Sequence, residues 1–297
     1  MEDYKESDQI NFRELFSIIW QARIIIFSLT SFFFIVGIFF SLSLTNLYKS
    51  TALLKISEPE NSNVIGGNIS GLASLVGANL SPSGSSKLYF ARDFLKSREL
   101  FNDLISDEET KAILAAVTGY DPILNKLIYD ENIYNPIKKS WSKDVSNYQL
   151  HQKFNSEIME VEIDYESQFI KMSVAHQSPI FAKELLELIV SKTNSNLRFK
   201  DQLSSTKAID YLQSKLMEIS FVEIKRSFNE LLKEELKTQM LVNIREDYFF
   251  EYIQSPQVTE NKFYPKRSQI SVIFGLFGFL FSVIFAVFRF YTSEVRK

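Results

Sequence analysis

The chain has 297 residues, of which 45% are apolar and 23% are charged, and its formal net charge is −3. It has no cysteine and only 2 histidines, which excludes disulfides, thiolate metal sites and a histidine-based metal site. Because positive charge is not concentrated in any region, the composition also argues against a nucleic-acid partner.

Residues 1–23 form a short segment of mixed charge that leads into the first long apolar run, Ile24 to Leu44. Asn11, with Glu14 three residues later, resembles a capping box at the start of an amphipathic helix. A cleaved signal peptide is the alternative, because Ser41-Leu42-Ser43 resembles a small-residue cleavage site. However, the apolar run is longer than the usual core of a signal peptide, and acidic residues precede it. We therefore predict an uncleaved transmembrane helix over residues 24–44.

After this run, the alternation from Leu47 to Ile56 predicts a strand, which must end before Pro59. The stretch from Asn61 to Lys87 is rich in glycine and is predicted to be a loop. Glycines followed by a lysine are one feature of phosphate-binding loops, but the Walker spacing is absent and no strand leads directly into the stretch. A mobile or partner-facing loop is the favoured interpretation.

The middle of the chain predicts a mixture of helices and strands. Ser106 to Glu109 resembles a capping box that begins a short helix. Met159 to Tyr165 and Phe169 to Val174 alternate in polarity and predict two strands joined by a turn. Ser178, as N-cap, and Pro179, at the first helical position, then predict the start of an apolar helix.

The segment from Gln202 to Asp247 has neither proline nor glycine, so it predicts one very long helix over about residues 202–247, roughly 69 Å if unbroken. Its apolar stripes change phase, so they do not form one heptad seam. A helix that is much longer than its own domain and has more than one apolar face requires a partner to cover it. Copies of the same chain are the simplest partner. A kinked pair of ordinary core helices is the alternative. The candidate oligomer-interface residues are Leu216, Phe228, Leu231 and Leu236.

The last apolar run, Ile270 to Phe288, contains no charged residue and predicts a second transmembrane helix over residues 270–288, followed by a tail over residues 289–297. Before this run, between the long helix and the second span, a strand is predicted from Tyr248 to Ile253. Two spans place residues 45–269 on one side of the membrane and both termini on the other, and the balance of lysine and arginine does not decide which side.

Both spans contain small residues, which permit close approach of two helices, although a glycine that faces lipid is the alternative for each. The candidates for transmembrane packing are Gly37, Ser41, Gly275 and Gly278.

The sequence contains no complete catalytic motif. Two S-x-x-K matches occur, at Ser140 to Lys143 and Ser204 to Lys207. They are not accompanied by the SDN and KTG motifs that, together with S-x-x-K, would indicate a serine nucleophile, so they are chance matches. Carboxylate pairs such as Glu108 with Glu109 lie on predicted exposed helix surface, where solvated charge is the simpler interpretation. We therefore expect no catalytic residue, no cofactor and no metal site.

The order of these parts resembles that of the Wzz-type chain-length determinants, also called polysaccharide co-polymerases. The segments that carry the resemblance are INFRELFSIIWQARIII, YKSTALLKI, GLASLVG, SQFIKMSVAHQSPIFAKELLELIV, and ELLKEELKTQMLVNIREDYFFEYIQSPQV running through FYPKRSQ into the last span. Two features depart from the family pattern. Only Pro256 and Pro265 remain in the approach to the second span, and the tail after Phe288 has no Walker motif and no room for the tyrosine kinase domain of larger relatives.

The resemblance implies an α+β membrane protein of the bacterial inner membrane. Two transmembrane helices would flank a periplasmic α/β domain with a small membrane-proximal sheet and one very long helix, and both termini would be cytoplasmic. It implies a bell-shaped homo-oligomer that is not an enzyme. Such a protein would set the length of a surface polysaccharide, O-antigen of lipopolysaccharide or a related polymer, by acting on the membrane-bound polymerase, with the growing polysaccharide chain as a further partner.

Two other functions remain open. The first is that of an export co-polymerase that works with a separate tyrosine kinase, which the neighbouring genes would reveal. The second is that of a two-span periplasmic sensor, against which the short terminal segments offer no output domain.

Overall fold

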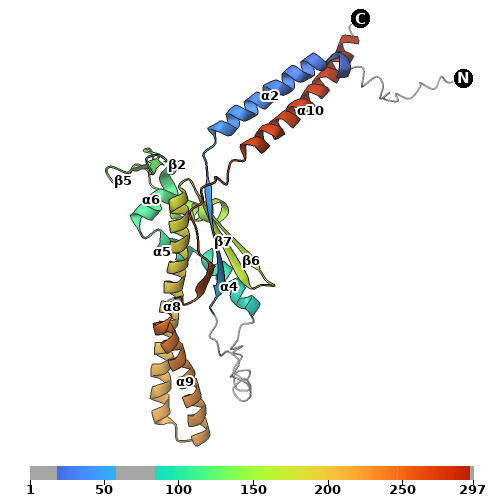
Figure 1. Ribbon diagram of the computed structural model, residues 1–297. Helices are drawn as coiled ribbons and strands as arrows, with labels where there is room; N and C mark the ends of the chain where they lie inside the picture. The colour runs from blue at the N-terminus through green and yellow to red at the C-terminus, as the bar shows by residue number, and fades with distance from the viewer. Residues whose placement is uncertain (1–18, 58–83, 246, 295–297) are drawn as a thin grey trace, which may run out of the picture. The chain divides into compact units, whose positions relative to one another are not determined.

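The computed structural model describes residues 19–57, 84–245 and 247–294, and it divides into two compact units (Figure 1). The first unit comprises the described parts of Met1–Asn46 and Lys262–Lys297, and the second comprises those of Leu47–Asn261. The glycine-rich loop from Asn61 lies outside the described residues up to residue 83, so its predicted character is not addressed by the structure.

The first unit is a pair of antiparallel helices, α2 (Arg23–Ser43) and α10 (Arg267–Glu294). The two apolar helices expected near the ends of the chain are therefore present, and both are long and apolar enough to cross a membrane. Large apolar side chains remain uncovered along them, with Ile24 76%, Phe27 77% and Phe277 68% exposed. Water is a poor solvent for such a surface, whereas lipid is a good one.

The second unit contains a four-stranded antiparallel sheet with the order β6-β7-β1-β8. The strands are β1 (Tyr48–Ile56), β6 (Met159–Asp164), β7 (Phe169–His176) and β8 (Phe250–Gln254). Alternate side chains of each strand point to the same face of the sheet, and one of the two faces is apolar. On this face Ala52 lies opposite Met172, and both side chains are fully buried. The chain enters and leaves this unit through neighbouring strands, since β1 pairs with β8.

Helix α8 (Pro179–Glu218) packs its first half against the buried face of the sheet. It begins as the sequence predicts: the Ser178 hydroxyl accepts a hydrogen bond from the Phe181 amide at 3.2 Å, and Pro179 occupies the first turn. Around α8 and the sheet lie α4 (Gly84–Leu95), α5 (Arg98–Leu104), α7 (Asn147–Lys153) and the π-helix Phe154–Ile158 that continues α7. Their largest contributions to the core are Leu95, Leu100, Phe101, Leu104 and Phe154.

The prediction of one unbroken helix over residues 202–247 is wrong. Helix α8 ends at Glu218, and a second helix, α9 (Val222–Ile244), turns back along it (Figure 1). A single helix would leave its apolar stripes in water, whereas the hairpin buries Ile209 and Leu212 of α8 and Val242 of α9. The break falls where the sequence stripes change phase, so the alternative of two helices describes this segment better.

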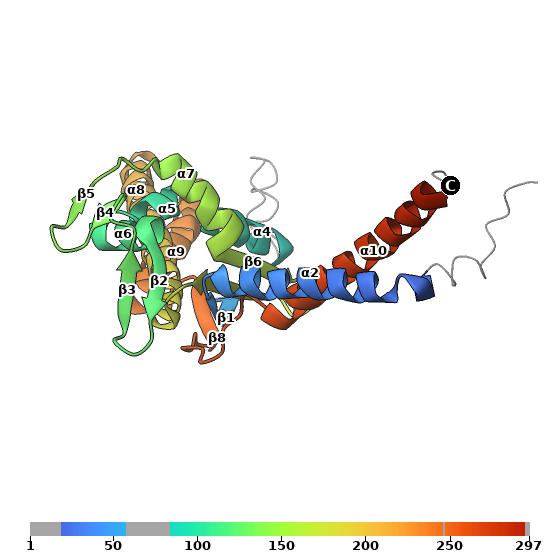
Figure 2. The ribbon, with the colours of Figure 1, turned by 90° about the horizontal axis from the view of Figure 1, so that it is seen from above.

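The region after α5 contributes Ile113 and Leu114 to the main core and adds a small second cluster of Ala112, Ala116 and Tyr134. Helix α6 (Glu108–Ala116) is followed by two hairpins, β2 (Val117–Asp121) with β3 (Lys126–Tyr129), and β4 (Tyr134–Asn135) with β5 (Ser140–Trp141), which lie beside α6 in Figure 2. The N-cap of α6 is Asp107 and not Ser106, so the predicted capping box is off by one residue. The Asp107 carboxylate accepts hydrogen bonds from the Thr110 amide at 2.9 Å and the Thr110 hydroxyl at 2.8 Å, and these bonds lower its pKa.

Candidate functional site

The contact between α2 and α10 is built from glycines that face phenylalanines. A Cβ added at Gly37 would lie 2.6 Å from the Cβ of Phe274, closer than two carbon atoms can approach. Gly278 faces Phe33 in the same way, with 2.5 Å to its Cβ, whereas an added Cβ at Gly275 would meet only the Phe34 ring, at 3.2 Å. The structure thus places Gly37, Gly275 and Gly278 at the helix contact, each against a ring of the opposite helix. Ser41, one turn after Gly37, is buried as well.

Polar contacts accompany this packing. The hydroxyl oxygens of Thr30 and Ser282 lie 3.4 Å apart, and the Arg267 guanidinium donates to the Asn46 side chain at 3.2 Å. Hydroxyl pairs between apolar helices contribute about 0.6 kcal/mol each in a membrane, so the packing of the rings contributes more to the stability of the pair. The helix pair therefore holds itself together while its outer surface stays apolar.

The α8–α9 hairpin exposes a series of large apolar side chains. Of the candidate interface residues, Leu231 is 40% and Leu236 46% exposed, while Leu216 and Phe228 are half-buried within the hairpin. Of these four candidates, Leu231 and Leu236 are therefore the two whose side chains are exposed to a partner. Further exposed apolar side chains on the hairpin are Phe199, Leu203, Tyr211, Met217, Phe221, Val222, Ile224, Met240 and Ile244. An exposed apolar surface of this kind is typical of protein interaction sites.

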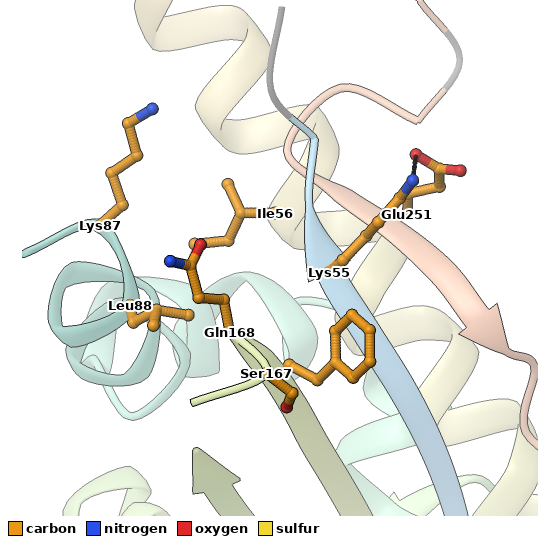
Figure 3. Close-up of a pocket in the computed structure, with 8 residues that line it drawn as sticks. Lys55, Ile56, Lys87, Leu88, Ser167, Gln168 and Glu251 are labelled. Carbon is orange, nitrogen blue, oxygen red and sulfur yellow. Dashed lines mark ion pairs between the residues drawn. The ribbon is translucent and has the colours of Figure 1, made fainter. Parts of the chain in front are cut away.

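A hollow of about 310 Å³ lies where β1 ends, bordered by the start of α4, the β6–β7 turn and β8 (Figure 3). Lys55 of β1 and Glu251 of β8 are direct partners in the strand pair and form an ion pair of 3.1 Å at one side of the hollow. Lys87, which the sequence analysis considered as part of a phosphate-binding loop, also borders the hollow. Because the lysine on β1 is paired with a carboxylate, the hollow lacks the concentrated positive charge of a phosphate site.

Among the residues that the structure describes, no group of three or more histidine, aspartate and glutamate side chains is arranged to hold a metal ion. His176, at the end of β7, is buried in the core with its Nδ1 accepting a hydrogen bond from the Ser178 amide at 3.1 Å. Burial lowers its pKa to about 4, so it is neutral at ordinary pH. Its ring packs on Phe181 at 4.6 Å between centroids, which makes it a structural residue of the strand–helix junction.

Residues 8–108 match the protein family described as "Wzz: Chain length determinant protein". The resemblance to the Wzz-type proteins is thereby confirmed. The matched residues include α2, β1, α4 and α5, so they run from the first apolar helix into the core of the second unit.

Two solved structures are also similar to the chain. One is a full-length bacterial polysaccharide co-polymerase, 11% identical with a TM-score of 0.40, where the likeness covers 94% of this chain and 97% of that chain. The other is a fragment of WzzB, a polysaccharide co-polymerase from Salmonella Typhimurium, 13% identical with a TM-score of 0.29, covering 74% of this chain and 100% of that chain. No curated protein matches the sequence.

One group of residues escaped the sequence analysis. The structure brings Glu108 and Glu109 of α6 together with three aromatic side chains, Tyr129, Tyr134 and Trp141, around a cavity. The sequence analysis assigned the carboxylates to a solvated helix surface and predicted no strand around Trp141. The available signal was the density of aromatic residues after α6, but spacing alone does not show that short hairpins fold back onto the helix.

Proposed function

We propose that this protein regulates the chain length of a surface polysaccharide, as an oligomeric scaffold of the bacterial inner membrane that acts on the polymerase. The observation that carries the proposal is the match of residues 8–108 to the chain length determinant family. The paired apolar helices and the mixed helix and sheet unit between them agree with such a protein.

In this proposal α2 and α10 cross the membrane, residues 45–269 form a periplasmic domain, and residues 1–23 and 289–297 lie in the cytoplasm. Along the chain only residues 44–47 separate α2 from β1, so the chain passes directly from the first span into the sheet of the domain. The apolar side chains left exposed on both helices support the assignment, since lipid would cover them at no cost.

The protein acts without catalysing a reaction. A scaffold controls polymer length by how long it holds the growing chain or the polymerase. Several copies of one weak binding contact, held together in an assembly, raise the effective concentration of that contact and so lengthen the time for which the partner stays bound. The exposed apolar side chains of the α8–α9 hairpin, Leu231 and Leu236 among them, support assembly of such copies. Polymerase and growing polysaccharide are the expected partners.

Deletion of the gene tests the proposal. Polymer synthesis should continue, but the preferred length should be lost, which a gel of the surface polysaccharide displays directly. Exchange of residues 45–269 with those of a relative of different preferred length should move the band, and exchange of residues 1–23 alone should leave it in place. Loss of all polymer would favour the export function with a separate kinase, and an unchanged distribution would contradict length control.

A further inference from the structure

A cavity of about 460 Å³ lies between the first turn of α6 and the two small hairpins. This volume falls in the range of small-ligand sites. The polar and aromatic side chains that line it are Asp107, Glu108, Glu109, Tyr129, Tyr134, Lys139 and Trp141. Figure 2 shows both hairpins beside α6.

The aromatic rings are held in place by the fold. Tyr134 and Trp141 are direct partners in the β4–β5 pair, and their ring centroids lie 5.0 Å apart. Tyr129 lies 5.8 Å from Tyr134, and Tyr134 itself is only 8% exposed because it packs against Ala112 and Ala116 of α6. The cavity wall is thus preformed and requires no ordering when a ligand binds.

Charged groups of both signs lie around these rings: the carboxylates of Asp107, Glu108 and Glu109 line the cavity together with Lys139. Glu108 accepts a hydrogen bond from the Trp141 indole N–H at 2.9 Å, which fixes the orientation of the tryptophan. Glu109 lies close enough to Tyr129 to raise its pKa, together with the larger effect of burial. The Lys111 ammonium lies 5.2 Å from the centre of the Trp141 ring. Carboxylate oxygens are therefore the main hydrogen-bond acceptors beside an aromatic wall.

We propose that this cavity binds uncharged sugar units of the polysaccharide, an inference that rests on the proposed function. A sugar ring has an apolar C–H face that packs on aromatic rings and hydroxyl groups that donate to carboxylates. An acidic sugar would be repelled, because the carboxylates of Asp107, Glu108 and Glu109 outnumber the one lysine of the lining, Lys139. A cationic ligand would compete with the Lys111 ammonium already beside Trp141. An uncharged sugar satisfies both conditions.

Binding is measured by calorimetry on the full chain in detergent. The probe is short fragments of uncharged polysaccharide, released from the producing cells by mild acid. Fragments of polygalacturonic acid serve as the acidic comparison. Trp141→Ala and Glu109→Gln should each weaken binding of the uncharged fragments about tenfold. Trp141→Phe, which keeps a ring, should lose less. Tyr148→Ala, at an aromatic residue outside the cavity and 51% exposed, should bind as the unaltered chain does.

Glu109 is exposed on the first turn of α6, so its replacement tests the cavity even if Trp141→Ala disturbs the hairpins. Binding by the unaltered chain that neither Trp141→Ala nor Glu109→Gln weakens would overturn the inference, as would equal affinity for acidic fragments or no binding at all. These results leave length control intact, because that function is judged separately by deletion of the gene.

Discussion

Asn194 of α8 holds the backbone of Phe250 in β8 with both atoms of its side-chain amide. Its Oδ1 accepts a hydrogen bond from the Phe250 N–H at 2.7 Å, and its Nδ2 donates to the Phe250 carbonyl at 3.0 Å. Oδ1 also accepts from the Phe249 N–H at 3.1 Å. Because Asn194 is buried, these bonds fix the edge strand β8 to the long helix without help from water.

Replacement of Asn194 by alanine should destabilise the protein strongly. It leaves two N–H groups and one carbonyl without partners in the core, which costs about 2–4 kcal/mol in free energy of unfolding. Denaturant unfolding of the full chain in detergent, followed by circular dichroism, measures the loss. Asn196→Ala is the matched control: Asn196 makes one bond, to Asp103 at 3.1 Å in a half-buried position, and its loss should cost at most about 1 kcal/mol. Equal costs for both variants would contradict the proposed role of Asn194.

Much of the fold follows from local sequence signals. The alternation in β1, β6 and β7 matches the sheet because each strand buries one face, and Ser178 with Pro179 starts α8 where predicted. The two apolar helices are recognisable because each is an apolar run long enough to cross a membrane, a pattern that depends on composition alone. These features depend on residues that are close in the chain.

The features that were missed depend on tertiary contacts. Ile219, Ser220 and Phe221 include no helix breaker, and the helix ends there because α9 gains more by packing on α8 than by continuing it. The residues of the aromatic cavity come from four separate elements whose hairpins are too short to show a period of two. Of the interface candidates, exposure distinguishes Leu231 and Leu236 from Leu216 and Phe228, which sequence periodicity could not do.

Acid should destabilise the protein through His176. Its pKa is about 4 in the folded chain and 6.5 in a model peptide, so between these pH values the unfolded chain binds a proton that the folded chain does not. The free energy of unfolding therefore falls as pH is lowered from 6.5 toward 4, by about 2–3 kcal/mol between pH 7 and pH 4.5 from this residue. Unfolding curves at the two pH values measure the loss.

His176→Gln should remove that part of the pH dependence, because the glutamine oxygen still accepts the hydrogen bond from the Ser178 amide but does not titrate. His151→Gln, which replaces the other histidine of the chain, is the control and should keep the dependence. A loss between pH 7 and pH 4.5 that is the same in His176→Gln as in the unaltered chain would show that carboxylates alone are responsible.

Gly278 should be essential for the pairing of α2 with α10. A Cβ at this position would lie 2.5 Å from the Cβ of Phe33, an atom that cannot move by rotation of the side chain, so Gly278→Val should push the helices apart. Because the chain has no cysteine, a Thr30→Cys, Ser282→Cys pair can report on the contact by forming a disulfide in membranes.

Valine at position 278 should lower the yield of this cross-link severalfold. Gly275→Ala is the control, since its Cβ would lie 3.2 Å from the far part of the Phe34 ring, which can turn aside. An undiminished cross-link in Gly278→Val would mean that the two helices do not pack through these residues.

The proposed oligomer should depend on Leu231 and Leu236. Both side chains are exposed in the single chain, so Leu231→Asp or Leu236→Asp should leave the fold of the protomer intact and act only where a neighbouring copy covers the position. There, an unpaired carboxylate would be buried at a cost of several kcal/mol, enough to disperse an assembly held by repeated contacts of this kind. Native mass measurement in mild detergent should show oligomers of the unaltered chain and smaller species for the aspartate variants.

Asn229→Asp, at an exposed polar position of α9, is the matched control and should remain assembled. If the leucine variants assemble as fully as this control, the interface lies elsewhere. If the unaltered chain is itself a monomer, the scaffold proposal loses its basis.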